Sequence, residues 1–438
     1  MHRNATTATR AAVLALAVVC TGRPAFADDG LLETLAGKGV IDADEYQQLK
    51  AQQARQERTA ATFSADKGLM LATGDGTYTL QFGVFQQIDF AAFDADGSDL
   101  SDGTLLRRSR LALGGKLGDD WQYRFQYEFA KASAAITDAY VTYSGFKPFS
   151  VTIGQAKLPF SMESLSSAAG TTFIERGLPA YVVSPILRAP GVQLARAGRR
   201  WSLAASATGE PLGDSASGDE GWGLAARATF APYVAGHRVV HLGLGVNWRK
   251  PTQDNSGTTP STSAVAFTAR PESNQAPNFL NSGSLLDTTS YRLSDAEFAT
   301  AFGAASLQGE YMWIDVQRDN GRDDLAFKTW YAQLAYTLTG ETRTYNVAKG
   351  VFDGIKPAHP LGTDGWGAFE AAARLSRLDL DDGSVSSGNE HDMTLGLSWY
   401  LTPYLRVNAN YVKVLKLDGG PYDGQKPSIY EMRVQLSF

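Results

Sequence analysis

The sequence has little cysteine and no long apolar runs. It contains one cysteine, Cys20, and beyond its N-terminus no stretch reaches the roughly 18 apolar residues that a membrane-spanning helix needs. This excludes a helical membrane protein but not a barrel of membrane-spanning strands, in which polar and apolar side chains alternate. Cys20 lies in a predicted secretion signal, so the exported chain is expected to lack cysteine. A closed, hydrogen-bonded barrel would supply the stability that disulfides cannot.

Residues 1–27 are predicted to be that secretion signal. Two arginines precede the apolar run 11–20, and residues 25–27 read Ala-Phe-Ala, which matches an A-x-A cleavage motif. Lipidation of Cys20 is the less favoured alternative, because Val19 stands where a small residue is expected.

Positive charge is also scarce. The chain has 40 Lys and Arg against 46 Asp and Glu, a formal net charge of −6. Loss of the signal removes three arginines and no acid, leaving 37 against 46, a net charge of −9. This sign argues against nucleic acid as a partner. It does not decide the selectivity of a pore, which depends on the charges that line its narrow part.

Histidine is rare as well, which bears on enzymatic function. Beyond the signal there are His237, His241, His359 and His391, and none has a nearby serine in a recognisable motif. No paired His or His/Glu helix motif occurs either. We therefore expect neither an enzyme nor a cofactor or metal ligand set.

Residues 121–130 are the most informative stretch that is present. They read Trp-Gln-Tyr-Arg-Phe-Gln-Tyr-Glu-Phe-Ala, with a large aromatic at every odd position. Successive strand residues point to opposite faces, so one face is an aromatic wall and the other carries Arg124 and Glu128. A barrel needs this pattern, with its apolar face toward lipid and its polar face toward a water-filled lumen. A soluble β-sandwich would leave the recurrence of such rows unexplained.

The pattern recurs along the chain and predicts an all-β fold. We expect a 16-stranded antiparallel transmembrane β-barrel over residues 75–438, preceded by a short helical segment at 28–74, with a helical hairpin around Gly37 and Gly39. That segment is interpreted as a periplasmic spacer or as a helper in trimer assembly or peptidoglycan contact. The expected strands are 78–93, 104–117, 121–131, 135–145, 149–157, 190–197, 200–208, 221–231, 238–250, 289–302, 306–317, 326–338, 366–379, 391–401, 404–416 and 428–438.

Turn lengths and the last strand support this topology. Short turns alternate with long polar links at 158–189, 209–220, 251–288 and 417–427, as expected for periplasmic turns and outer loops. The long link 339–365 is the exception, because parity places it on the periplasmic side. The last strand alternates apolar residues and ends in Phe, like the signal read by the outer-membrane insertion machinery.

Several stretches resemble the phosphate-selective porin O and P family of Gram-negative outer membranes. They include Leu106-Arg107-Arg108-Ser109-Arg110-Leu111-Ala112-Leu113-Gly114-Gly115 and Tyr331-Ala332-Gln333-Leu334-Ala335-Tyr336-Thr337-Leu338-Thr339-Gly340-Glu341, followed by Phe352-Asp353-Gly354-Ile355-Lys356-Pro357. The resemblance covers roughly residue 75 to the C-terminus. It implies a homotrimer of 16-stranded barrels in which an arginine ladder leads anions to a lysine-rich constriction.

The family's functional positions are only partly retained. The resemblance places its paired arginines on Arg107 and Arg108 and two constriction tyrosines on Arg110 and Lys157. One ladder arginine is replaced by Phe85. The phosphate-binding loop lysine falls on Ser164 and a nearby acid on Thr137. The resemblance thus implies a pore more firmly than it implies phosphate as the selected solute.

The strand pattern itself points to candidate pore-lining cations. Arg108 and Arg110 lie opposite the leucine face and are expected to point into the lumen. They either contact passing anions or pair with lumenal acids such as Glu128; Arg can hold oxyanions through paired donors. Arg107 shares the leucine face, where counting predicts that it reaches toward lipid headgroups. The predicted anion-binding or pore-lining residues are Arg107, Arg108, Arg110, Arg124, Lys157, Arg176 and Arg188.

The segment 158–189 is too long and too apolar for a solvated loop. Loops beyond about 15 residues without secondary structure are usually functional. We expect it to fold into the barrel and narrow it; packing on a neighbouring subunit is the alternative. Its predicted constriction-loop residues are Phe160, Ser164, Phe173 and Tyr181. The lumenal acids Glu128, Glu310 and Glu431 are expected to moderate any anion preference.

The sequence therefore predicts an exported outer-membrane porin, expected to be a homotrimer in contact with outer-membrane lipid. Small anions are expected to diffuse through it passively, with phosphate or polyphosphate the leading solute. The alternative is a general diffusion porin of weak selectivity that passes organic acids or sugars.

Overall fold

The computed structural model describes residues 29–56, 59–64, 68–94, 96–97, 100–130, 135–212, 219–254 and 262–438. The predicted secretion signal and Cys20 lie outside these residues. Among the described helices, none is long and apolar enough to cross a membrane.

In its described part, the N-terminal unit contains two helices, α2 (Asp29–Gly37) and α3 (Ala43–Gln56). A reciprocal cap begins α3: the Glu45 backbone N–H donates to Asp42 Oδ1 at 2.7 Å, and the Asp42 N–H donates to Glu45 Oε2 at 3.2 Å. Such a capping box satisfies two backbone donors that would otherwise lack partners. The helical hairpin predicted around Gly37 and Gly39 is confirmed.

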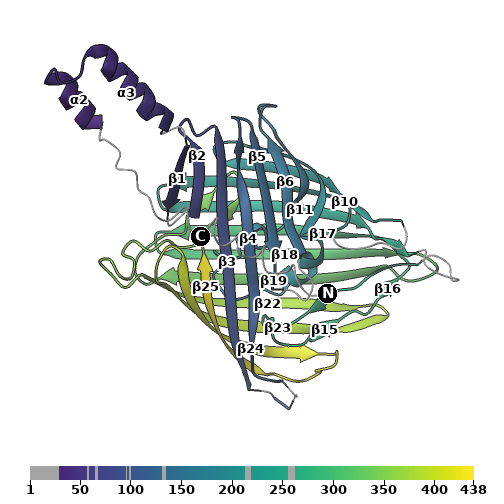
Figure 1. The fold of residues 1–438 in the computed structure, drawn as a ribbon. Helices are drawn as coiled ribbons and strands as arrows, with labels where there is room; N and C mark the ends of the chain where they lie inside the picture. Colours follow the sequence, from purple (N-terminus) through teal and green to yellow (C-terminus); the bar gives the residue numbers. More distant parts are fainter. Residues whose placement is uncertain are drawn as a thin grey trace, which may run out of the picture. The chain divides into compact units, whose positions relative to one another are not determined.

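The second unit is a closed antiparallel β-barrel. Sixteen strands follow one another around its wall, and β25 pairs with β3 to close the ring (Figure 1). Closure leaves no exposed sheet edge within the wall. The wall strands are β3 (Tyr78–Asp94), β4 (Gly103–Leu117), β5 (Trp121–Glu128), β6 (Ala135–Tyr143), β7 (Ser150–Lys157), β8 (Arg188–Ala197), β9 (Trp201–Thr208), β10 (Trp222–Ala235), β11 (Arg238–Lys250), β17 (Thr288–Phe302), β18 (Ala305–Arg318), β19 (Leu325–Thr337), β22 (Ala368–Asp382), β23 (Val385–Tyr400), β24 (Leu405–Asp418) and β25 (Ser428–Ser437).

All sixteen predicted strands are confirmed, and most boundaries agree within a few residues. Two short strands, β1 (Thr59–Ser64) and β2 (Gly68–Thr73), were not predicted. β2 pairs with the start of β3, with Leu69 opposite Phe82. Each spans only six residues, too short for its alternation to stand out from a loop.

The two faces of the wall separate as the alternation predicts. Trp121, Phe125 and Phe129 are 41–50% exposed on the outside, whereas Gln126 and Glu128 between them are buried in the lumen. An apolar outer face and a polar inner face are what lipid and a water-filled lumen each require.

The long segment between β7 and β8 folds into the barrel, as predicted. It contains α4 (Met162–Leu165), α5 (Pro179–Val183) and the 3₁₀ turn η1 (Ser184–Ile186). Leu178 and Val182 pack against Leu293 and Ile314 of the far wall. We call residues 158–187 the inward loop.

The link between β11 and β17 is not a simple solvated outer loop, which corrects the prediction. Phe267, Phe279 and Leu285 belong to the same buried cluster as the inward loop. Glu272 reaches the wall and accepts hydrogen bonds from Arg374, Ser376 and Thr394. The described part of this link contains the short strands β12 (Gln253–Asp254), β13 (Thr262–Val265), β14 (Thr268–Ala269), β15 (Leu280–Asn281) and β16 (Leu285–Leu286).

The exceptional periplasmic link between β19 and β22 also enters the lumen. It carries β20 (Tyr345–Asn346) and β21 (Val351–Phe352), and Val351 and Phe352 are buried with Met162 of the inward loop. Arg343 pairs with Glu370 at 2.7 Å and donates to the Gly170 carbonyl. This link is long because it forms part of the lumen, which explains its break from the short-turn rule.

Candidate functional site

A cavity of about 1430 Å³ lies inside the barrel against β3–β8. The inward loop and the periplasmic link form part of its lining. Nine basic and two acidic side chains line it among the described residues. All seven predicted cations are among these residues. The basic residues are Arg107, Arg108, Arg110, Arg124, Lys157, Arg176, Arg188, Lys349 and Lys356, and the acidic residues are Asp138 and Asp353.

Several of these cations are held by carboxylates. Arg110 Nε donates to Glu128 Oε2 at 2.7 Å. Pairing with Glu128 was one of the two roles that the sequence left open for Arg110, the other being contact with passing anions. Arg124 and Arg188 share Asp138, at 3.3 and 2.8 Å. Each pair fixes a guanidinium in place and reduces its net charge; the group around Asp138 keeps one positive charge in excess.

Arg107 points into the lumen, so its expected reach toward lipid headgroups is wrong. It forms a bidentate ion pair with Glu175 of the inward loop, at 2.7 and 3.0 Å. The cause is a register shift: Gln87 pairs with Arg108 but Ile88 pairs with Leu106, which leaves Arg107 as the extra residue of a bulge. A bulge inverts the side-chain alternation on one side of it, and counting along the sequence cannot detect this.

Three of the cations have only neutral partners. Arg108, Lys157 and Arg176 have no carboxylate within ion-pair distance in the part of the chain that the structure describes. Arg108 Nη1 donates to Gln87 Oε1, and its buried Nε lacks a hydrogen-bond partner among the described residues. These side chains therefore contribute uncompensated positive charge to the cavity.

Lys157 and Arg176 also hold the inward loop. Lys157 Nζ donates to the carbonyls of Ser164, Leu165 and Ser166 at 2.6–3.0 Å. Arg176 donates to the carbonyls of Glu163 and Ser166, each at 2.9 Å. Cations near the last carbonyls of a helix stabilise its end, and here they cap the turn formed by α4.

The four residues predicted for the constriction loop do not line the cavity among the described residues. Phe160, Ser164 and Phe173 are at most 2% exposed, and Tyr181 packs against the main buried cluster. Phe173 lies 4.4 Å from the Arg374 guanidinium on the far wall. These side chains anchor the loop, whereas its surface toward the cavity comes from Leu165, residues 167–169, Arg176, Ser184, Pro185 and Leu187.

Glu175 is the electrostatic centre of the inward loop. Burial alone would raise its pKa, but the guanidiniums of Arg107, Arg433 and Arg108 outweigh burial and hold the pKa well below its usual range. In contrast, burial raises the pKa of Glu163, and Arg374 and Arg176 offset this only in part. Glu175 therefore fastens the loop to the two wall strands that flank β3, through Arg107 of β4 and Arg433 of β25.

Sequence reasoning missed three arginines on the strands that lead up to the barrel closure. Arg374, Arg406 and Arg433 point inward from β22, β24 and β25 and donate to loop carbonyls at residues 171–175. Arg433 also pairs with Asp89 and Glu175, at 2.6 and 2.7 Å. The alternation of polar and apolar residues predicts that these arginines lie on the polar face. It does not predict the loop carbonyls and carboxylates to which they bind.

Lys349, Asp353 and Lys356 were also missed as cavity residues. They come from the link between β19 and β22, which the sequence assigned by parity to the periplasmic side without a part in the lumen lining. At the position where the family resemblance implies a ladder arginine, Phe85 lines the cavity, and the Arg110 guanidinium lies 5.9 Å from its ring.

Comparison with known proteins identifies the family. The model of the family "Phosphate-selective porin O and P" matches residues 55–438. The chain belongs to this family. It is 26% identical to Porin O of Pseudomonas aeruginosa over 379 residues, which is 79% of this chain and 85% of that protein.

Solved porin structures share the fold. An anion-selective porin from Comamonas acidovorans has a TM-score of 0.52 at 14% identity, covering 82% of this chain and 100% of that one. The trimer form of OmpT from Vibrio cholerae has a TM-score of 0.51 at 11% identity, covering 83% and 100%. The chain is thus an outer-membrane porin with a closed 16-stranded barrel, as the sequence predicted.

Proposed function

We propose that this porin lets small anions diffuse passively through the outer membrane, with phosphate or polyphosphate as the leading solute. The observation that carries the proposal is the cavity lining, nine basic and two acidic side chains among the described residues. Arg108, Lys157 and Arg176 add positive charge to it and form no ion pair with a carboxylate among the described residues. Membership of a family described as phosphate-selective and similarity to Porin O support phosphate.

Planar-bilayer recording tests the proposal. Under a potassium chloride gradient, the reversal potential should have the sign of anion preference. Added phosphate should then reduce the chloride current at concentrations that leave a matched increase in ionic strength without effect. Equal chloride and potassium permeability would contradict anion selection, and a chloride current insensitive to phosphate would contradict phosphate as the solute.

A general diffusion porin of weak selectivity is the second candidate. It is favoured by the ion pairs of Arg107, Arg110, Arg124 and Arg188, because paired arginines attract passing anions less than free ones. Weak binding also allows rapid release. A permeability ratio near one together with passage of neutral sugars in a liposome-swelling assay would support this candidate.

We further propose that the porin assembles as a homotrimer within outer-membrane lipid and has no enzymatic activity. The apolar outer wall supports contact with lipid, and a trimer form is known for the structurally similar OmpT. His241 is engaged by Glu297 and Tyr345 at 3.0 and 2.6 Å, not by a serine. Chemical crosslinking in detergent should yield a three-subunit species; a product no larger than a monomer would contradict the trimer.

A further inference from the structure

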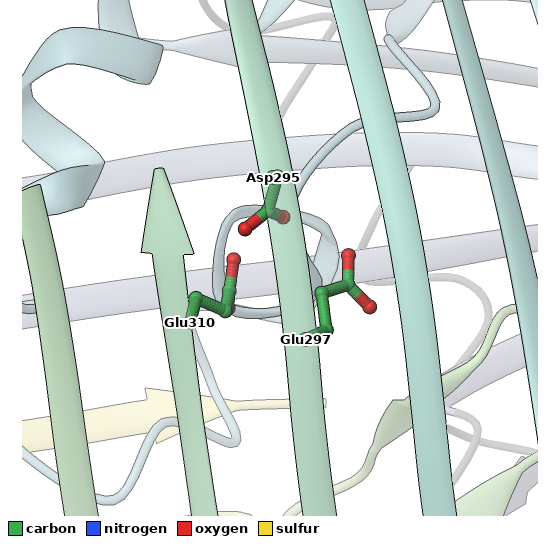
Figure 2. Close-up of side chains that lie close together, drawn as sticks. All are labelled: Asp295, Glu297 and Glu310. Atoms are coloured by element: carbon green, nitrogen blue, oxygen red, sulfur yellow. The ribbon is translucent and has the colours of Figure 1, made fainter. Parts of the chain in front are cut away.

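Three carboxylates converge on the wall opposite the cationic cavity. Glu297 of β17 pairs directly with Glu310 of β18, and Asp295 lies two residues before Glu297 on the same lumenal face. One carboxylate oxygen of each lies within 4.8 Å of the others (Figure 2). We call Asp295, Glu297 and Glu310 the acidic triad.

The members of the triad differ in how their charge is balanced. Glu297 receives both Nε and Nη2 of Arg227, at 2.7 and 2.6 Å, and lies 3.0 Å from His241. Glu310 Oε1 accepts from the Glu163 backbone N–H at 2.6 Å and from the Tyr331 hydroxyl at 2.9 Å. Neither contact brings a positive charge to Glu310.

Three oxygens of the triad have no hydrogen-bond partner among the described residues: both of Asp295 and Oε2 of Glu310. Asp295 is only 3% exposed. Figure 2 shows its carboxylate turned toward Glu310, while the Glu297 carboxylate points away from the pair. The unpaired oxygens are therefore gathered between Asp295 and Glu310.

A second unpartnered polar side chain lies on the next strand. Asn247 of β11 is 1% exposed, and neither its Oδ1 nor its Nδ2 has a hydrogen-bond partner in the described structure. It pairs with Leu293, two residues from Asp295, whose own partner is Gly245. Diagonal neighbours on one face of a sheet lie about 7–8 Å apart. Asn247 is therefore a second buried, unpartnered polar side chain on the same lumenal face, one diagonal step from Asp295.

Buried carboxylates of this kind need compensation. A buried unpaired charge costs several kcal/mol or more, so it is normally paired with a cation or bound to a metal. In the same lumen Asp89 is paired with Arg433, and Glu370 with Arg343. Glu390 and Asp392 are also buried with unpartnered oxygens, but among the described residues only Asp295, Glu297 and Glu310 come together as a group of three carboxylates. No basic group lies within ion-pair distance of Asp295 or Glu310 among the described residues.

We propose that Asp295 and Glu310 bind a Ca²⁺ ion, with Glu297 and Asn247 at the margin of the site. Calcium takes oxygen ligands at 2.3–2.6 Å in flexible geometry, so two ligands across the ion lie about 5 Å apart. One oxygen of each triad carboxylate lies within 4.8 Å of the others, which is close enough for them to share one such ion. Magnesium binds at about 2.0–2.1 Å, demands a stricter octahedron and retains more water.

The site would also connect to the inward loop. Glu310 Oε1 holds the backbone N–H of Glu163, the second residue of α4. A cation that fixes Glu310 therefore fixes the start of the loop that faces the cavity. Its removal leaves two neighbouring carboxylates at this anchor without a cation to hold them in place, and is expected to increase current noise in single channels.

Calcium titration calorimetry of the full-length porin tests the proposal. Protein refolded without lipopolysaccharide should bind one Ca²⁺ per chain, and Asp295→Asn should weaken binding at least tenfold. Asp392→Asn is the matched control: Asp392 is 1% exposed with both oxygens unpaired among the described residues, but it lies outside the triad. It should bind Ca²⁺ like the wild type.

The result that overturns the proposal is an absence of Ca²⁺ binding by folded wild type, or equal binding by wild type and Asp295→Asn. The first result would mean that Asp295 and Glu310 share a proton instead. Heat-modifiable gel mobility checks that each variant is folded. If Asp295→Asn does not fold, Glu310→Gln replaces it, since an amide oxygen can still accept from Glu163 and Tyr331.

Discussion

Arg108 is the residue that bears most directly on anion passage. It lines the cavity from β4, and its described partner is the neutral Gln87. Arg107 and Arg110 beside it are paired with Glu175 and Glu128. A unit charge about 4 Å from an anion contributes about 1 kcal/mol even in water-like surroundings, which corresponds to about fivefold in local anion concentration.

Arg108→Met should lower the anion-to-cation permeability ratio, by about two- to fivefold on that estimate. Arg108→Lys should retain most of the ratio, because it keeps the charge but loses the planar fork. Arg322→Met removes an exposed cation paired with Asp287 outside the cavity and should leave the ratio unchanged. Reversal potentials in planar bilayers measure all three; equal effects of Arg108→Met and Arg322→Met would remove Arg108 from the pathway.

At the residue scale, the sequence predicted which cations line the cavity but not their partners. Alternation along β4 and β5 placed Arg108, Arg110 and Arg124 on the lumenal face. It failed at Arg107, because the bulge there depends on the register between β3 and β4 and cannot be recognised from the sequence of β4 alone. The acidic triad was invisible for the same reason: its members come together through the register of β17 and β18.

At the scale of elements, the inward loop is held by charged contacts at several points. Lys157 and Arg176 bind carbonyls near α4, and Arg406 binds those of residues 171 and 172. Glu175 joins Arg107 of β4 to Arg433 of β25, the two strands on either side of β3. A loop fastened through both its backbone and the Glu175 carboxylate keeps a fixed position in the lumen.

Glu175→Gln should destabilise the folded barrel at neutral pH, by about 3–5 kcal/mol, the usual cost of removing one partner from a buried ion pair. Because the folded-state pKa of Glu175 lies below its ordinary value of 4.5, its contribution is complete above about pH 4.5 and is lost as pH falls through the folded-state value. The gap from wild type should therefore shrink in acid. The midpoint of the heat-modifiable mobility shift, measured at pH 7 and pH 3, reports this gap.

Glu220→Gln serves as the control for that experiment. Glu220 is exposed in an outer loop and accepts from the Glu210 backbone N–H. Its replacement should change the midpoint little at either pH. An equal shift for Glu175→Gln at pH 7 and pH 3 would show that lost packing, not charge, accounts for the effect.

The wall strands were predictable because period-two alternation persists over 8 to 17 residues in each of them. The inward loop was predictable from its length and apolar content. The entry of the β11–β17 link and of the β19–β22 link was not, because both are rich in polar and turn-forming residues. Their lumenal positions depend on single contacts such as Glu272 with Arg374 and Arg343 with Glu370, which join residues distant in sequence.

At the scale of the whole molecule, the barrel is complete without the N-terminal helices. The ring closes through β25 and β3, whose pairing runs from Ser428 opposite Asp94 to Ser437 opposite Phe85. Every cation of the cavity lies at or beyond Arg107 in the sequence. Residues 29–56 take no part in the strand pairing that closes the wall, and they do not line the cavity.

Deletion of residues 29–56 should therefore leave a folded barrel with unchanged heat-modifiable mobility and unchanged single-channel conductance and anion preference. The physical reason is that membrane insertion requires every backbone group of the wall to be paired, and the sixteen wall strands, with β2 beside the start of β3, pair without residues 29–56. Crosslinking of the deletion variant then distinguishes the two interpretations of the helical segment. Retained trimers indicate a spacer, and monomers with normal conductance indicate a role in assembly. An unfolded, non-conducting product would contradict the independence of the barrel.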